Sequence, residues 1–272
     1  MSGYASRMVF WAATLLVLIL GVSAMAPVLS PWQRDAIDLD NISAPPTSRH
    51  PLGTDQLGRD VLTRLLHGGR FTLAVAILSV AVSLAAGVIL GSAAGWLGGA
   101  ADRIVSLAID LFLSVPVFLV MLLAASAAGD RIWLIPLIIG GTSWMETARV
   151  VRSRFRQIRE EGFVEAARSA GATGPRIVLR HMLPQTAGAL LVAATAGLAG
   201  AMLVESALSF LGFGVQPPVP TWGNMMQGAW MTLRISPLAA LAPGLLIFVT
   251  CLCFNLLCER FRRRLAKDGG SF

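Results

Sequence analysis

Continuous apolar runs of about 20 residues recur along this chain of 272 residues and constrain its fold more than any other feature. A helix rises 1.5 Å per residue, so a run of about 20 residues crosses a hydrocarbon core about 30 Å thick. A membrane β-barrel would instead need short strands in which apolar and polar residues alternate. The chain is 55% hydrophobic and only 14% charged, which leaves little for a soluble domain. We therefore predict an all-α integral membrane protein.

Six of these runs are predicted to cross the membrane. They extend from about Met8 to Val28, Phe71 to Trp96, Ile104 to Ala128, Ile132 to Ala148, Ala187 to Leu211, and Pro237 to Cys258. The first run contains Ala24-Met25-Ala26, which resembles a signal-peptidase site. A cleaved signal peptide is therefore an alternative to the retained first helix that we prefer.

The Lys and Arg residues orient the predicted bundle. The loops on one side, with both termini, hold 15 of these residues, eight of them in residues 149–184, and the opposite side holds seven. Because cytoplasmic loops carry an excess of positive charge, we predict that both termini are cytoplasmic. The predicted domains are residues 1–28 (tail and first span), 29–70 (extracytoplasmic loop), 71–258 (core, with a cytoplasmic loop at 149–184) and 259–272 (basic cytoplasmic tail). We expect the basic residues to meet lipid headgroups rather than nucleic acid.

Small residues at four-residue intervals mark one face of two spans. In the second span they are Ser83, Gly87, Gly91 and Gly95, and in the fifth they are Ala189, Ala193, Gly197 and Ala201. Such faces allow close contact between helix backbones in lipid, where dispersion rather than the hydrophobic effect drives packing. The three cysteines lie in or beside the last span and are predicted to be buried thiols, because their spacing suits neither a zinc site nor a disulfide framework.

Two acidic residues, Asp110 and Glu205, fall inside predicted spans. An unpaired carboxylate in hydrocarbon costs several kcal/mol, so each is expected to face protein, water or a partner helix. We assign Asp110, Glu205 and Ser209 as candidate pathway or subunit-contact residues. The alternative for each acid is a structural hydrogen bond that fixes helix packing.

Two polar segments have recognisable local patterns. Prolines exclude a long helix from the first half of residues 29–70, whereas Leu57 to Leu66 has apolar residues at helical spacing and predicts a short amphipathic helix on the membrane surface. In residues 149–184, the stretch from Phe163 to Ala170 favours a helix that Gly171 ends, and Thr173 is placed to cap a second helix that continues to Leu183. The sequence thus predicts two short helices joined at a glycine corner, and a loop that lies among lipid headgroups without any partner is the alternative.

The sequence lacks the motifs of ATP hydrolysis and of several enzyme classes. Its only lysine is Lys267, so no G-x-x-x-x-G-K-[ST] loop exists, and none of its three histidines belongs to an H-E-x-x-H motif. Gly141 to Met145 misses the G-x-S-x-G pattern at its last position. We therefore expect no catalytic residue and no metal site, and any work drawn from ATP must come from another chain.

The 149–184 loop resembles a known motif. Glu165-Ala166-Ala167, Gly171 and Leu183-Pro184 resemble the EAA loop of inner-membrane permease subunits of binding-protein-dependent ABC importers. The family pattern has Ile two residues before the Leu, where this chain has His181, a variant found in the peptide/nickel branch of the family. The coupling residues implied by the resemblance are Glu165, Ala166, Ala167, Arg168, Gly171, Leu183 and Pro184.

Further motifs are similar to those of the same branch. They are His50 to Asp60, Asp102 to Pro116, and Glu205 to Gly212 with Pro217-Pro218 and Trp222-Gly223. The extracytoplasmic signature residues implied are Gly53, Thr54, Asp55, Gly58, Arg59, Asp60 and Trp222. The length of the chain and its Gly-Thr-Asp motif resemble the C-type of the two permeases that usually pair in these systems.

The resemblance implies a multi-pass permease of the bacterial inner membrane that imports di- or oligopeptides. Its implied partners are a second homologous permease, two ATP-binding subunits that hold ATP and magnesium, and an extracytoplasmic substrate-binding protein. No cofactor is expected in this chain itself. Nickel chelates or glutathione are alternative substrates. A stand-alone channel or secondary transporter, in which Asp110 and Glu205 couple ions, is a weaker alternative because the two halves show no inverted repeat.

Overall fold

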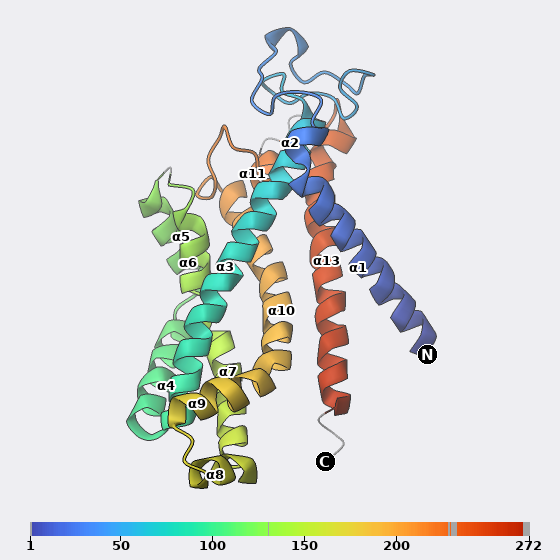
Figure 1. Cartoon of the computed structure of the whole chain (residues 1–272). Coiled ribbons are helices and arrows are strands. Elements are labelled where there is room, and N and C mark those ends of the chain that lie inside the picture. Colours follow the sequence, from blue (N-terminus) through green and yellow to red (C-terminus); the bar gives the residue numbers. More distant parts are fainter. Residues whose placement is uncertain (1, 130, 228, 230–232, 269–272) are drawn as a thin grey trace.

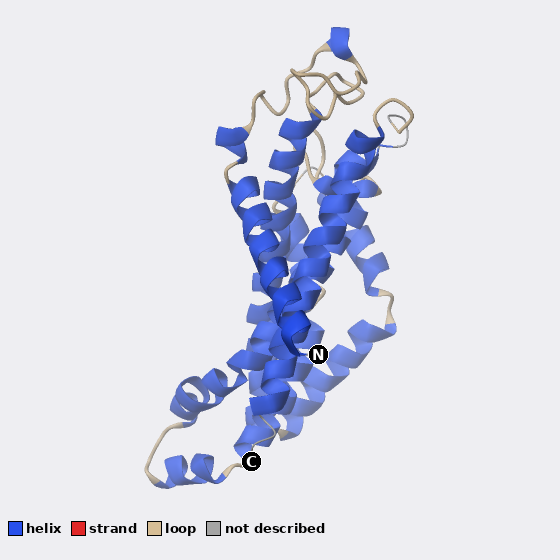
Figure 2. Ribbon diagram, turned by 90° about the vertical axis from the view of Figure 1, so that its right-hand side faces the viewer, coloured by secondary structure: helices blue, strands red, loops and turns tan. Residues whose placement is uncertain are grey.

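The computed structural model describes every residue of the chain except 1, 130, 228, 230–232 and 269–272, and its long helices form an elongated bundle (Figure 1). In chain order the elements are α1 (Ser2–Ala24), α2 (Ala26–Leu29), the 3₁₀ helix η1 (Leu39–Asn41), α3 (Val61–Leu97), α4 (Gly99–Ser114), α5 (Val117–Ala128), α6 (Leu134–Gly141), α7 (Trp144–Arg159), α8 (Gly162–Ser169), α9 (Gly174–Ile177), the π-helical turn η2 (Val178–Met182), α10 (Leu183–Phe210), α11 (Trp222–Gln227) and α13 (Pro237–Asp268). The polar loop between α2 and α3 lies at one end of the bundle. The described end of α13 lies at the other end, with α8 and α9 (Figure 2).

The helical membrane architecture is confirmed, but six crossings are not. Among the residues that the structure describes, four stretches are long and apolar enough to cross a membrane, namely Arg7–Ala24, Val61–Leu97, Gly174–Phe210 and Pro237–Leu265. Helices α4 and α5 together are also long and apolar enough, but they are bent by 82° where they meet. They supply a fifth span if the bent pair is counted as one broken crossing. The last helix also continues ten residues beyond the predicted end of the sixth span at Cys258.

The third and fourth predicted spans are each broken into two helices, which corrects the prediction that each is continuous. Val115 adopts an extended conformation, as expected for a residue that precedes a proline, and Pro116 starts the next helix. Between α6 and α7, the hydroxyls of Thr142 and Ser143 donate to the carbonyls of Ile138 and Ile139. These bonds back to the preceding turn accompany the interruption of the helix.

The prediction of a separate surface helix before the second span is also wrong. Helix α3 begins at Val61, where the Asp60 carboxylate accepts a hydrogen bond from Thr63 N at 2.7 Å, and it continues for 37 residues, or about 55 Å. The pair Gly68-Gly69 does not break it. Trp222 packs so closely there that an added Cβ would approach its ring to 3.2 Å at Gly68 and 2.6 Å at Gly69.

The chain also stays helical through Pro184, where we predicted that a second short helix would end. After the four residues of α9, the π-helical turn η2 shifts the hydrogen-bonding pattern, so that Pro184 falls in the first turn of α10. The shift from the wider π-helical pattern to the α-helical pattern occurs directly before Pro184, whose missing N–H is accommodated at this change. Gly174 to Phe210 therefore forms one long helical span.

The close contact predicted for the second span is confirmed between α3 and α7. A Cβ on Gly87, Gly91 or Gly95 would approach an atom of α7 to 2.5, 2.6 or 2.5 Å. The Ser83 hydroxyl extends this seam by donating to the Ser143 carbonyl at 3.0 Å. Small residues thus hold the two backbones together along three helical turns.

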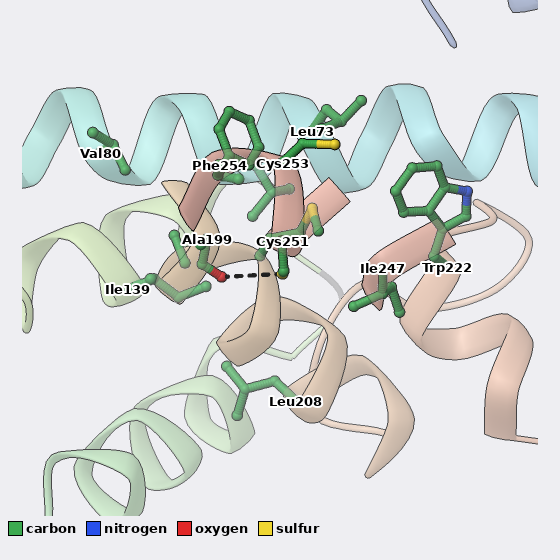
Figure 3. Packing of buried hydrophobic residues seen from close by; sticks show 14 of the residues in the cluster. Leu73, Val80, Ile139, Ala199, Leu208, Trp222, Ile247, Cys251, Cys253 and Phe254 are labelled. Atoms are coloured by element: carbon green, nitrogen blue, oxygen red, sulfur yellow. Dashed lines mark hydrogen bonds between the residues drawn. The ribbon is translucent and has the colours of Figure 1, made fainter. Parts of the chain in front are cut away.

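The main apolar core lies among α3, α10 and α13 and includes the cysteine thiols (Figure 3). Cys251 and Cys253 are buried, as predicted, and Cys258 is half-buried. The Cys251 thiol contacts the Ala199 carbonyl across the helix interface at 3.7 Å. Trp222 closes one end of the same core and is 1% exposed.

Candidate functional site

The predicted glycine corner is present at the end of the bundle that bears α8. Gly171 follows α8 with φ of +82°, in the left-handed region that favours glycine. Its N–H donates to the Arg168 carbonyl, and the N–H of Ala172 donates to the Ala167 carbonyl. This pair of bonds is the Schellman arrangement that ends helices at glycine. Thr173 occupies the N-cap position of α9 as predicted, although its side chain makes no capping hydrogen bond.

The corner has a hydrophobic core of its own. Val164 of α8 and Ile177 of α9 are buried against Phe155 and Ile158 of α7, and Met182 completes the cluster. Each of these side chains is at most 5% exposed. Because the corner buries this cluster against α7, it is anchored to the bundle rather than suspended from it.

The outward face of α8 is open. Glu165, Ala166 and Arg168 are exposed, and Ala167 is half-buried. A small, exposed face allows the surface of another protein to approach the helix backbone closely. Of the other predicted coupling residues, Pro184 is exposed and Leu183 packs against the cluster under the corner.

Arg168 also connects the corner to α3. Its guanidinium carbon lies 4.8 Å from the centroid of the Trp96 ring, in a cation–π contact. Arg159 donates to the Trp96 carbonyl at 3.2 Å. Residues near Gly174 pack on the same indole, so α8, α9 and α7 all meet the last turn of α3.

An ion-pair cluster that the sequence reasoning missed lies beside this contact. Asp102, in the first turn of α4, is buried and accepts hydrogen bonds from Arg152 and Arg156 of α7. The bond to Asp102 raises the pKa of the Arg152 guanidinium, so this pair stays charged at physiological pH. The spacing of Arg152 and Arg156 on one helix face was the available signal, but nothing in the sequence places that face beside Asp102.

The candidate acid Asp110 lies on the exposed side of α4. Its carboxylate is 3.1 Å from the Arg149 guanidinium of α7, and the two side chains are 70% and 52% exposed. Asp110 therefore has a counter-ion within the chain. Its role as a pathway or subunit contact stays a prediction.

Glu205 and Ser209 lie together at the centre of a buried polar cluster. The Ser209 hydroxyl donates to the Glu205 carboxylate at 2.7 Å, and the hydroxyls of Thr72 and Thr221 also hydrogen-bond to it. Glu205 is 0% exposed, so its partners within the chain surround it completely. These contacts match the structural alternative considered for this acid, and a contact with a pathway or a second subunit stays a prediction.

Trp222 attaches the segment after α10 to α3. Its indole N–H donates to the Leu65 carbonyl at 2.9 Å, and its backbone N–H donates to the Thr72 hydroxyl at 3.1 Å. Ser209 accepts a hydrogen bond from Val215 N at 3.1 Å and so fixes the beginning of the same segment. The predicted signature residue is therefore a buried anchor near the end of the bundle where α3 begins.

The other predicted signature residues fold the loop between α2 and α3 around the start of α3. Gly53 and Gly58 have φ of +77° and +72°, and a Cβ on Gly58 would lie 1.7 Å from the Asp38 carbonyl oxygen. Thr54 is buried and hydrogen-bonds to Asn41 and Ala44. Asp55 pairs with Arg59 at 2.7 Å and with Arg64 at 3.4 Å, and His50 bonds Asp60 at 2.9 Å. The structure thus brings these residues together as one hydrogen-bonded loop.

A cavity of about 400 Å³ opens among α3, α5, α10 and the break between α6 and α7. Its α10 wall is made of Ala193, Gly197, Gly200 and Ala201, with Val204 beyond. Small residues of the fifth span thus border a hollow rather than only a helix contact. None of Asp110, Glu205 and Ser209 lines it.

These features define a membrane transport subunit that carries no ATP-binding loop and presents an exposed helical corner at one end. The chain belongs to the family described as "Binding-protein-dependent transport system inner membrane component", whose model matches residues 87–267. Transport components of this family are permease subunits rather than enzymes.

Named relatives and one solved structure agree with this assignment. A Brucella suis protein provisionally named as a peptide permease is 36% identical over 94% of this chain and 86% of its own length. The oligopeptide permease OppC of Haemophilus influenzae is 33% identical over 91% of this chain and 80% of its length, and the glutathione permease GsiD of Pectobacterium atrosepticum is 34% identical over 92% and 84%. A chain of the MetNI methionine ABC transporter shares the fold, with a TM-score of 0.57 over 75% of this chain and 97% of its own, at 19% identity.

Proposed function

We propose that this chain is the C-type permease subunit of a bacterial ABC importer that moves di- or oligopeptides across the inner membrane. The observation that carries the proposal is the exposed corner formed by α8, Gly171 and α9, which is packed on its own core in a chain without an ATP-binding loop. The peptide assignment draws on the names of the relatives. Glutathione is a second candidate substrate because GsiD is as similar as OppC.

The proposed assembly pairs this chain with a second homologous permease. Two ATP-binding subunits, which hold ATP and magnesium, dock at Glu165 to Gly171, and an extracytoplasmic binding protein delivers substrate to the loop of residues 29–60. The chain crosses the membrane six times if α4–α5 and α6–α7 each count as one broken crossing, with both termini in the cytoplasm. The 15 basic residues assigned to the cytoplasmic side, against seven outside, support this orientation.

The contacts of the corner suggest how motion of the ATPase subunits is transferred to the helix bundle. When ATP binding closes the two ATPase subunits, α8 moves with the groove that holds it. Arg168 on Trp96, and Arg152 and Arg156 on Asp102, transfer that motion to the junction of α3 and α4. The permease then switches between two packed states and carries out no covalent chemistry.

Reconstitution of the complete importer in proteoliposomes tests this function. We expect uptake of a radiolabelled tripeptide that requires ATP and the binding protein, and we expect Gly171→Leu or Glu165→Lys to separate ATP hydrolysis from uptake. A Cβ at Gly171 would meet no atom within 4 Å, but any side chain there strains the left-handed backbone, whereas Gly162→Ala, in open space and with ordinary φ, is the control. Normal uptake by both coupling variants at normal expression would refute the docking role. Uptake by this chain alone without ATP would favour a stand-alone transporter.

A further inference from the structure

The cavity beside α10 has the size of a small-molecule site and an unusual polar lining. Its volume of about 400 Å³ lies within the range of about 300–1,000 Å³ typical of ligand pockets. Most of its wall is apolar or small. The polar residues that line it are Ser79, Ser83, Thr142, Ser143, Glu146 and Thr147.

Several of these hydroxyls already have partners in the backbone. Ser79 donates to Val75 O at 2.8 Å, and Ser83 donates to Ser143 O at 3.0 Å. Thr142 and Ser143 donate to carbonyls of α6 at 2.6 and 2.7 Å. Because each of these hydroxyls already donates its single proton to a carbonyl, it can only accept a hydrogen bond from a ligand in the cavity.

Glu146 is different, because it is the one ionisable residue in the described lining and it has no partner. It lies in the first turn of α7 and is exposed. Within the part of the chain that the structure describes, it makes no hydrogen bond and no ion pair. The nearest cation in sequence on its helix face, Arg149, is paired with Asp110, and Arg152 is paired with Asp102.

A local structural role for Glu146 is absent as well. Ser143-Trp-Met-Glu146 has the spacing of a capping box, in which the serine and glutamate side chains would bond to each other's backbone N–H groups. The box is not formed, because Ser143 makes no side-chain cap and its hydroxyl donates to Ile139 O instead. A glutamate that lines a cavity and neither caps a helix nor pairs with an arginine is a candidate for function.

We propose that Glu146 is a specificity-determining residue of the transport pathway and binds the terminal α-ammonium group of the solute in the cavity. An ammonium supplies the positive charge and the hydrogen-bond donors that this carboxylate lacks, and the apolar wall formed by α10 suits small side chains. This inference rests on the proposed function, since it assumes that the cavity belongs to the transport pathway of a peptide importer.

The experiment uses the complete importer in proteoliposomes with trialanine, whose only positive charge is the terminal ammonium. Glu146→Gln keeps the size of the side chain and removes its charge, and we expect uptake at subsaturating trialanine to fall about tenfold or more. Glu146→Asp keeps the charge and is expected to restore at least half of the uptake. Glu259→Gln, which removes a half-buried acid paired with Arg262 and Arg263 outside the cavity, is the matched control and should transport normally.

The outcomes separate this inference from the function on which it rests. If the unmodified importer takes up neither trialanine nor glutathione with ATP, the proposed function fails and this inference fails with it. If it transports trialanine and Glu146→Gln does so equally well, only the role of Glu146 is overturned. Equal losses in the Gln and Asp variants would refute recognition by charge, and loss of assembly with the second permease in Glu146→Gln would assign the residue a structural role instead.

Discussion

Replacement of Gly91 by alanine tests the packing of α3 on α7, the seam along which the corner formed by α8, Gly171 and α9 is attached to the bundle. The new Cβ would lie 2.6 Å from the Ala148 carbonyl oxygen and 2.9 Å from the Val151 Cβ. Ordinary contact begins at 3.4 Å, so the shortfall from the carbonyl is about 0.8 Å. The obstructing atom belongs to the backbone, and no change of rotamer relieves it. The two helices must therefore move apart.

The expected cost follows from this geometry. A gap of 0.5–1 Å removes about a quarter to a half of the dispersion energy of each contact along the seam, and overpacking of this kind costs about 1–3 kcal/mol. For a chain of this size, that cost corresponds to a melting temperature lower by roughly 3–9 °C. Gly21→Ala on α1, where a Cβ would meet no atom within 4 Å, is the control and should be neutral or slightly stabilising.

The assay is thermal unfolding of the assembled importer in one detergent, with each variant measured against the unmodified complex. A Gly91→Ala variant that melts at the same temperature as the Gly21→Ala variant would refute the reasoning. That result would show that the seam relaxes without loss, and the close contact between α3 and α7 would then not explain how the corner is held.

Four further substitutions probe the other clusters. Asp102→Asn should lower the melting temperature, because it leaves a partly buried arginine without its counter-ion at a cost of about 1–3 kcal/mol. Asp110→Asn removes a charge from an exposed pair and should change stability by less than about 1 kcal/mol in the same assay. Trp222→Phe keeps the ring but loses its bond to a backbone carbonyl, and it should destabilise the complex by about 1 kcal/mol, measured as a shift of the unfolding midpoint. Gly58→Ala, whose Cβ would lie 1.7 Å from a carbonyl oxygen, should open the outer loop to limited proteolysis and weaken uptake that depends on the binding protein.

Features that depend on one residue and its immediate neighbours could be predicted from the sequence. Gly171 ends α8 because glycine tolerates positive φ at low cost. The four-residue spacing of Gly87, Gly91 and Gly95 directly indicates a helix face that another helix contacts closely. Pro116 was visible in the sequence, but its effect was not predicted. A proline inside an apolar run is compatible with a kinked span as well as with the 82° bend observed here, and only the surrounding packing decides between them.

The pairing of charges could not be predicted, because it depends on which helix faces meet. Both Asp102 and Asp110 lie on α4, two turns apart, yet one is buried between two arginines and the other is exposed beside one. Their different surroundings arise from the position of α4 against α7. That position depends on the break at Ser143 and on the contact of α7 with the glycine seam of α3.

The same comparison explains why the acid with the most informative environment was overlooked. Hydropathy draws attention to acids in the middle of long apolar runs, and it selected Glu205, which the fold surrounds with hydroxyl groups from α3, α10 and the segment before α11. Glu146 stands near the end of a run and beside arginines, where a salt bridge within the helix is the simplest expectation. In the structure Arg149 and Arg152 of α7 pair with acids of α4, so Glu146 lines the cavity without a counter-ion. A carboxylate that lines a cavity and has no cation partner in the described chain can pair with a cation from outside the chain, which is the reason to look for that cation in the transported solute.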